Sequence, residues 1–173
     1  IDSYKTATAI FRDRFRQLPG DFDDGVARLG ASGEGDNDGA IDGNGNTTEG
    51  IYFWEDLVLA GLITGSADVS GAATDVIPDS KMGGIVNALN ADVQNGMQDT
   101  NMLRVGNNDG NGQSDADLLT GAEAGEIDDL FDDGIGNEGD IQATGATDCR
   151  NATTGVYNFT DGDVACQMIW RLQ

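Results

Sequence analysis

The sequence contains no histidine, only two prolines, and few aromatic or basic residues. Without histidine there is no Ser-His-Asp triad and no imidazole general base, so the usual machinery of nucleophilic hydrolases is excluded. The lack of histidine and of any Cys-x-x-Cys pair also disfavours a zinc or copper site. No apolar run approaches the roughly 20 residues that a membrane-spanning helix needs, and no signal peptide is visible.

Positive charge is scarce: Lys and Arg number 9 against 31 Asp and Glu, which gives a formal net charge of -22. A surface of this charge repels the phosphates of nucleic acids and anionic membranes, so we expect no nucleic-acid partner. The many carboxylates have three interpretations. They form a strongly solvated surface suited to salty surroundings, or they bind a divalent cation, or they contact a basic partner.

The only two cysteines, Cys149 and Cys166, lie close to each other near the C-terminus. A disulfide between them would close a short loop and contribute about 3 kcal/mol in the chain-entropy model. The alternative is a pair of buried thiols. Spacing and context favour the disulfide, which would place the chain in an oxidising compartment such as the periplasm or the cell exterior.

The 173 residues fit one domain, and 26 glycines predict long loops between short elements. Residues 1–17 carry an apolar stripe at helical spacing, which predicts an amphipathic helix that ends at Leu-Pro-Gly-Asp. We expect this helix to continue upstream of Ile1, because the pattern begins without an N-terminal cap. A second helix is expected over residues 51–63. Thr120 and Glu123 have capping-box spacing and predict the start of a third helix, with Gly134 at its left-handed end.

Short apolar segments predict an antiparallel sheet, with strands over residues 85–93 and 101–105, near residue 141, and over residues 156–159 and 164–172. The last segment alternates strictly, so we expect one buried and one exposed face. The predicted fold is therefore α+β: an N-terminal helix packed on an antiparallel sheet, with two further short helices and long loops rich in Gly and Asp. The helix-to-sheet packing is expected to come from Tyr4, Phe11, Phe15 and Leu18.

Three stretches of the chain occur in an order that resembles one family. The first ends in Leu-Pro-Gly-Asp at residues 18–21, and the second is Phe-Trp-Glu-Asp-Leu-Val-Leu-Ala-Gly-Leu-Ile at residues 53–63. The third runs from Leu-Thr-Gly-Ala-Glu-Ala-Gly-Glu-Ile-Asp at residues 119–128, through Asp-Asp-Gly at 132–134, to Gly-Asp-Ile-Gln-Ala at 139–143. Together they resemble the bacterial type IV pilin-like and type II secretion pseudopilin-like prepilins, where a C-terminal cysteine pair is also common. The family's prepilin signal and hydrophobic helix half are not in this sequence.

The resemblance implies a non-enzymatic structural subunit of an extracellular type IV filament, either a pilus or a secretion pseudopilus. Residues 1–18 would be the C-terminal half of the long pilin helix, and residues 19–173 the soluble headpiece. The partners would be further copies of the chain or other pilins, with no small-molecule substrate. Before assembly, the subunit would be anchored in the inner membrane and face the periplasm. After assembly, it would lie in a filament on the cell surface. The alternative is an ordinary secreted α+β domain with similar turns.

Calcium is the one cofactor that the sequence suggests. Residues 34–45 match the middle of an EF-hand loop, with oxygen ligands at alternate positions and a Gly at the bend. Glu34 and Gly45 break the pattern at its ends, so Asn44 or Glu49 would have to complete the site. The candidate ligands in this loop are Asp36, Asp38, Asp42 and Asn44. A second, looser candidate loop holds Asp109, Asn111, Asp115 and Asp117, and by the family resemblance a third place is the pair Asp161 and Asp163.

Two other functions compete with the filament subunit. One is a calcium-dependent extracellular adhesion or binding module, which a calcium titration would support. The other is a secreted hydrolase, which would need a cleft with two facing carboxylates of perturbed pKa. The sequence assigns no catalytic residue.

Overall fold

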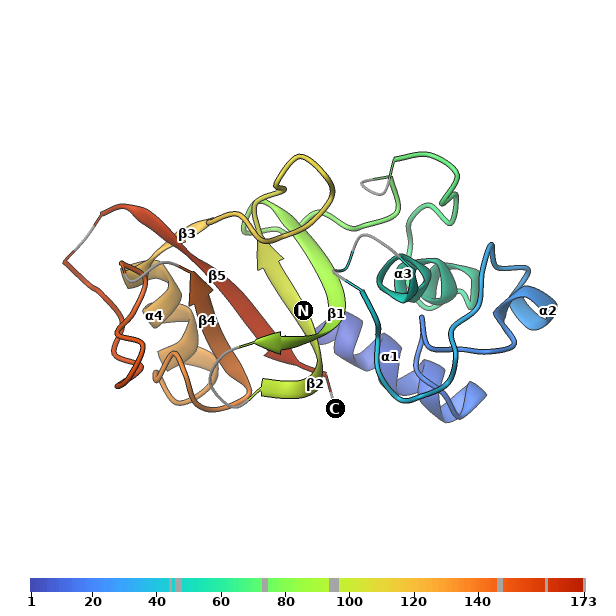
Figure 1. Ribbon diagram of the computed structural model, residues 1–173, viewed down its shortest axis with the longest axis horizontal. Helices are drawn as coiled ribbons and strands as arrows, with labels where there is room; N and C mark the ends of the chain where they lie inside the picture. The colour runs from blue at the N-terminus through green and yellow to red at the C-terminus, as the bar shows by residue number, and fades with distance from the viewer. Residues whose placement is uncertain are drawn as a thin grey trace.

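The computed structural model describes residues 1–43, 45, 48–72, 75–93, 97–145, 148–160 and 162–172. These residues form an α+β fold in which an N-terminal helix and further helices accompany a five-stranded antiparallel sheet (Figure 1). The elements in chain order are α1 (Asp2–Phe15), α2 (Gly25–Leu29), α3 (Glu49–Leu59), β1 (Ile85–Val93), β2 (Met97–Gly106), β3 (Leu119–Thr120), α4 (Gly121–Phe131), β4 (Ile141–Gly145) and β5 (Val164–Arg171). The predicted fold class is confirmed at this level.

The sheet is organised around β5. One edge of β5 pairs with β2 and then with β3, while its other edge pairs with β4. The long hairpin of β1 and β2 forms the far side of the sheet. In Figure 1, α1, α2 and α3 gather at the end of the molecule beyond β1, and α4 lies at the opposite end beside β4. The fold therefore has two helical ends joined by one sheet.

The prediction that β5 is buried on one face only is wrong. Every residue from Ala165 to Trp170 is buried, although Val164 at the start of the strand is half exposed. The reason is that both faces are covered. Cys166, Met168 and Trp170 face the main core, and a second small apolar cluster covers the opposite face. That cluster consists of Leu89, Met97, Met102 and Ile169.

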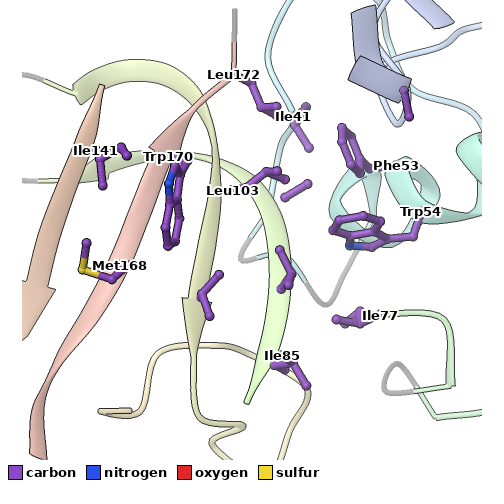
Figure 2. Packing of buried hydrophobic residues seen from close by; sticks show 14 of the residues in the cluster. Ile41, Phe53, Trp54, Ile77, Ile85, Leu103, Ile141, Met168, Trp170 and Leu172 are labelled. Atoms are coloured by element: carbon purple, nitrogen blue, oxygen red, sulfur yellow. The ribbon is translucent and has the colours of Figure 1, made fainter. Parts of the chain in front are cut away.

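Aromatic side chains of α3 fill the main core against the sheet. Phe53 and Trp54 are completely buried, and Figure 2 shows both facing the strands that carry Leu103 and Trp170. Ile41 and Ile77, from loops, lie beside them. Burial of each such side chain contributes about 1.5–3 kcal/mol, so α3 is the main apolar link between helices and sheet.

The predicted N-terminal helix is present as α1, and its aromatic stripe packs mainly against α3 and the turn that follows α1. Tyr4 makes an edge-to-face contact with Trp54, with ring centroids 5.0 Å apart. Phe11 and Phe15 both contact the ring of Phe22, at 5.6 and 5.1 Å. Since α1 contacts α3 and α3 contacts β1, the helix reaches the sheet chiefly through α3. Leu18, the last residue of the predicted stripe, is half-buried.

The ends of the other helices follow local chemistry. The capping box of α4 is confirmed, because the Thr120 hydroxyl accepts from the Glu123 N–H and the Glu123 carboxylate accepts from the Thr120 N–H. The expectation that Gly134 ends this helix is wrong. The helix stops at Phe131, and Gly134, with φ of 74°, lies in the turn beyond Asp132. Two short elements, α2 and β3, were not predicted, since neither is long enough to show a period.

The C-terminal region contains the predicted disulfide, between Cys149 after β4 and Cys166 in β5. Their Cα atoms are 5.0 Å apart, and both residues are fully buried. The strand predicted over residues 156–159 is wrong: this segment makes one isolated bridge, between Tyr157 and Arg150. The disulfide therefore fastens a largely irregular segment to the central strand.

Candidate functional site

Two buried carboxylates lie where the turn after α1, the loop over residues 36–42 and the start of α3 meet. Asp21 is the last residue of the Leu-Pro-Gly-Asp turn, and Glu49 is the first residue of α3. Their side chains are almost inaccessible, with 1% and 6% exposure. Together with the exposed Asp36 they form a group whose oxygen atoms lie within 4.8 Å of one another. We define Asp21, Asp36 and Glu49 as the loop carboxylate group.

Backbone amides of the loop bind the two buried carboxylates. Asp21 accepts one N–H from Asp38 through Oδ1 and one from Gly39 through Oδ2, both at 3.0 Å. Glu49 accepts the N–H of Asp36 through Oε1 at 3.0 Å and that of Asp42 through Oε2 at 2.7 Å. Hydrogen bonds to ionised carboxylates are stronger than neutral ones. The loop is thus wrapped around charges supplied by the turn after α1 and by α3.

Burial dominates the electrostatics of this group. It raises the pKa of Asp21 and of Glu49, while the loop N–H groups lower both pKa values by stabilising the ionised form. The nearby Asp36 and Asp21 carboxylates raise the pKa of Glu49 further. Among the described residues, no Lys or Arg forms an ion pair with the group. Its negative charge is therefore offset by amides alone.

The sequence pattern of the first acidic loop predicted four side-chain ligands, and of the three that the structure describes, one joins the group. Asp36 does so, whereas the Asp38 carboxylate accepts the N–H of Ala40 at 2.8 Å in a tight turn. Asp42 contributes its backbone N–H to Glu49, and Asp42 itself is exposed to solvent. Asn44 lies outside the described residues. The loop therefore offers mainly backbone donors to this site.

The two buried members of the group had different signals in the sequence. Glu49 was one of two residues, with Asn44, that the sequence offered to complete the loop site, and its carboxylate lies beside Asp36. Asp21 was missed as a ligand candidate, because it belongs to a turn that precedes the loop by many residues. Its signal was the acidic last position of Leu-Pro-Gly-Asp, which a turn does not require. Calcium binding at this group stays a prediction.

The second acidic loop holds the other predicted ligands, which are Asp109, Asn111, Asp115 and Asp117. The Asp109 carboxylate accepts the N–H of Asn111 at 2.7 Å, and these local bonds lower its pKa. The Asp117 carboxylate accepts from the side chain of Gln167 at 3.2 Å. No three carboxylates of this loop converge within the described part of the chain. Asp161 lies outside the described residues, and Asp163 is exposed just before β5.

Two further acidic residues connect loops to α3 from within the Phe-Trp-Glu-Asp sequence. Glu55 accepts both the N–H and the hydroxyl of Ser32, at 2.8 and 2.7 Å. Asp56 accepts the N–H of Gly20 at 2.8 Å, and burial raises the pKa of Asp56 to about 7. Both side chains are at most 2% exposed. These two carboxylates bind Gly20 and Ser32 to α3. Because both are buried, a ligand in solution does not reach them.

A groove of about 560 Å³ lies elsewhere, between the start of α1, the end of α4 and the sheet. Its lining includes Tyr4, Lys81, Phe131 and Trp170, and none of the buried carboxylates of the loop group.

In the described residues, no helix has both the length and the apolar character that crossing a lipid bilayer demands.

The chain was compared with protein-family models, curated proteins and solved structures, and none of them matches it.

Proposed function

We propose that this chain is the headpiece of a structural subunit of an extracellular type IV filament, either a pilus or a secretion pseudopilus. The observation that carries the proposal is the contact between the first two of the three motifs that resemble pilin-like proteins. The Leu-Pro-Gly-Asp turn is bonded to α3 through Gly20 and Asp56. The same turn holds the acidic loop through Asp21. Residues in such roles maintain a shape, which is what a filament subunit supplies.

The arrangement of the whole chain supports the same proposal. An N-terminal amphipathic helix lies at one end of an antiparallel sheet, and a disulfide fastens the last segment to the central strand. The pilin-like family, by resemblance, uses such a helix to join subunits and such a cysteine pair near the C-terminus. In this proposal, α1 belongs to the C-terminal half of the long helix through which pilin subunits assemble.

The charge distribution offers a way for neighbouring subunits to contact each other. Lys5, Arg12, Arg14 and Arg16 belong to α1 or to its C-cap, and the three arginines are exposed. The chain as a whole carries a net charge of -22. A positive helix and acidic loops on one subunit are complementary surfaces for two copies of the chain.

A hydrolase is less well supported. The carboxylates with raised pKa values are at most 6% exposed, and none lines the groove beside α1; they are Asp21, Glu49, Asp56 and Asp128. Glycoside hydrolysis needs two carboxyl groups on either side of a bound sugar. A sugar has no access to these four.

The filament proposal is tested on cells that make the full-length protein. Surface fibres are removed by shearing, sedimented and probed with an antibody against this domain. We expect the protein in the sedimented fibres, and its loss from them in a strain without prepilin peptidase. Protein found only as free monomer in the medium would refute the proposal.

A pair of charge-reversal variants tests the role of α1 in the same assay. Arg12→Glu with Arg16→Glu should reduce fibre yield without changing the melting temperature of the isolated domain. Lys81→Glu, which reverses an exposed charge outside α1, is the matched control and should leave the yield unchanged. Equal yields for both variants would remove α1 from the subunit contact.

The calcium-dependent binding module remains the second candidate, because the loop carboxylate group offers three oxygen ligands and forms no ion pair with a Lys or Arg of the described residues. Calorimetric titration with calcium and melting with and without chelator test it, with Glu49→Gln as the variant that removes one ligand charge. This candidate fails if calcium produces no binding heat that Glu49→Gln reduces and does not change the melting temperature of the unmodified domain.

A further inference from the structure

A second group of carboxylates gathers at the C-terminal end of α4. Asp128, Asp132 and Asp133 place oxygen atoms within 4.8 Å of one another. Asp128 is in the last turns of the helix, and the other two directly follow its last residue, Phe131. The group comes from the third stretch of the chain and is separate from the loop carboxylate group.

The position of the group is electrostatically unfavourable for carboxylates alone. The C-terminus of a helix carries partial negative charge from its free carbonyl groups, and it favours cations. The last turn of α4 contains no basic residue. The nearby Arg150 directs its Nε–H to the Ala143 carbonyl at 2.6 Å. Within the described residues, no Lys or Arg forms an ion pair with the group.

Among the described residues, Asp128 has one buried oxygen atom without a hydrogen-bond partner. Asp128 is completely buried, and its Oδ2 accepts the hydroxyl hydrogen of Tyr157 at 2.7 Å. Its Oδ1 is also buried and has no hydrogen-bond partner among the described residues. A buried carboxylate oxygen without a partner carries a desolvation cost that no hydrogen bond offsets. The carboxylate therefore lacks one ligand on the side that the tyrosine does not occupy.

The other two carboxylates are held in place while remaining open to solvent. Asp132 accepts the N–H groups of Asp140 and Ile141 through Oδ2, at 2.6 and 2.7 Å. Asp133 accepts the N–H of Ile135 at 2.8 Å. Both aspartates are exposed, and Asp132 also lines the groove between α1 and α4. An ion therefore has an approach to the group from solvent.

We propose that Asp128, Asp132 and Asp133 bind a divalent cation, with Ca²⁺ preferred. An oxygen-only ligand set suits Ca²⁺ and Mg²⁺ and not softer metals. The three oxygen atoms lie within 4.8 Å of one another, so one cation can contact all three. Ca²⁺ tolerates irregular oxygen geometry, whereas Mg²⁺ demands a near-ideal octahedron and keeps several of its waters, so carboxylates fixed by the fold suit Ca²⁺ better. Carbonyl groups and water complete its shell.

The bound ion would connect three parts of the C-terminal half. Asp128 brings the end of α4, and the Tyr157 hydroxyl that binds it brings the segment between the two cysteines. Asp132 brings the start of β4 through its bonds to Asp140 and Ile141. Occupancy would therefore stabilise this half of the domain. The proposal stands on these contacts and does not depend on the filament function.

The test is calorimetric titration of the chelator-treated domain with CaCl₂ and, separately, MgCl₂, in about 0.15 M salt to screen diffuse attraction. We expect one site for Ca²⁺ with Mg²⁺ at least tenfold weaker, and a melting temperature that rises with Ca²⁺. Asp128→Asn and Asp133→Asn should each weaken Ca²⁺ binding at least tenfold. Asp133→Asn keeps an acceptor for Ile135 at an exposed position, so it serves if the buried variant does not fold.

Asp129→Asn is the matched control, because Asp129 is an exposed carboxylate on α4 that does not belong to the group. It should leave the Ca²⁺ affinity within twofold. Glu49→Gln, in the loop carboxylate group, should likewise retain this site. The proposal is overturned if the unmodified domain takes up no Ca²⁺ at millimolar concentration. It is also overturned if only Glu49→Gln abolishes binding, or if Asp129→Asn weakens binding as much as Asp133→Asn.

Discussion

The backbone N–H of Gly20 donates a hydrogen bond of 2.8 Å to Oδ2 of Asp56, which joins the turn after α1 to the interior of α3. Gly20 has a φ of +85°, and its Cα approaches α3 so closely that an added Cβ would lie 2.4 Å from the Glu49 carbonyl oxygen. The two residues come from two different motifs of the sequence. Their contact makes the first helix, the turn and α3 one mechanical unit.

Replacing Gly20 with alanine should separate this unit. The left-handed backbone costs an alanine about 1 kcal/mol, and the clash with the α3 backbone adds about 1–3 kcal/mol as overpacking. We expect a total loss of about 3 kcal/mol in the free energy of unfolding, measured by chemical denaturation. Gly30→Ala is the control, since Gly30 has a φ of +74° with no described atom within 4 Å of the added Cβ. Equal losses in the two variants would contradict the close-approach explanation.

The contribution of Asp56 to the free energy of unfolding should fall as the pH rises from about 4 to 7. Burial raises the pKa of Asp56 to about 7 from its ordinary value of 3.8. Between these values the folded state binds the proton and the unfolded state does not, so a rising pH favours unfolding.

Asp56→Asn removes this dependence and retains an oxygen acceptor for Gly20. At pH 8 we expect the variant to be more stable by about 2 kcal/mol, in line with a relieved buried charge. Denaturation midpoints measured across pH 4–8 provide the check. Asp13→Asn, at an exposed position of α1, should keep the slope of the unmodified domain. A destabilised Asp56→Asn at pH 8 would show that the ionised form is the stabilising one.

Glu49→Gln should loosen the acidic loop locally. The amide side chain keeps one acceptor oxygen and loses the other, so either the N–H of Asp36 or that of Asp42 is left without its partner. A lost hydrogen bond of about 1.4 kcal/mol corresponds to about tenfold faster amide exchange. Hydrogen exchange measured by NMR reports each amide separately. The amides of Asp38 and Gly39, which Asp21 holds, should change less.

Glu34→Gln is the control for that experiment, because Glu34 is an exposed carboxylate in the same part of the chain. Exchange at residues 36–42 should stay as in the unmodified domain. If it accelerates as much as in Glu49→Gln, the loop responds to net charge and not to the two specific hydrogen bonds.

Removing the disulfide should destabilise the domain by about 3 kcal/mol, the loop-closure contribution expected for a separation of 17 residues. The variant Cys149→Ala with Cys166→Ala tests this through its melting curve. Reducing agent should lower the melting temperature of the unmodified domain and leave that of the double variant unchanged. A double variant as stable as the unmodified protein would assign the bond a role other than stability.

Local sequence chemistry accounts for most of the secondary structure. The apolar stripe over Tyr4, Phe11 and Phe15 is enough to predict α1, and the spacing of Thr120 and Glu123 is enough to predict the start of α4. The pairing of the cysteines also followed from their number and position. Such signals lie within a turn or two of the chain, where period and capping act. The same locality explains the missed elements, since two- and five-residue segments have no measurable period.

The candidate sites depended on contacts that no local pattern contains. The acidic loop was recognisable by its composition, but its partners were Asp21 from the turn after α1 and Glu49 from α3. At the end of α4, a run of acidic residues is in sequence terms typical of an exposed helix face. Only the approach of Tyr157 from a distant segment buries Asp128 and leaves one of its oxygens unpaired.

By itself, the sequence determined the longer helices and most of the strands, that the chain is strongly acidic, and that its two cysteines pair. Hydrophobic period, capping and cysteine count are sufficient for these properties because they act over short stretches. The tertiary structure alone decided that both faces of β5 are covered, that α1 reaches the sheet through α3, and which carboxylates are buried. Burial is a property of residues brought together from far apart in the chain, and it raises the pKa values of the buried carboxylates. Burial also separates the unpaired Asp128 oxygen from water, and the proposed cation site depends on that oxygen.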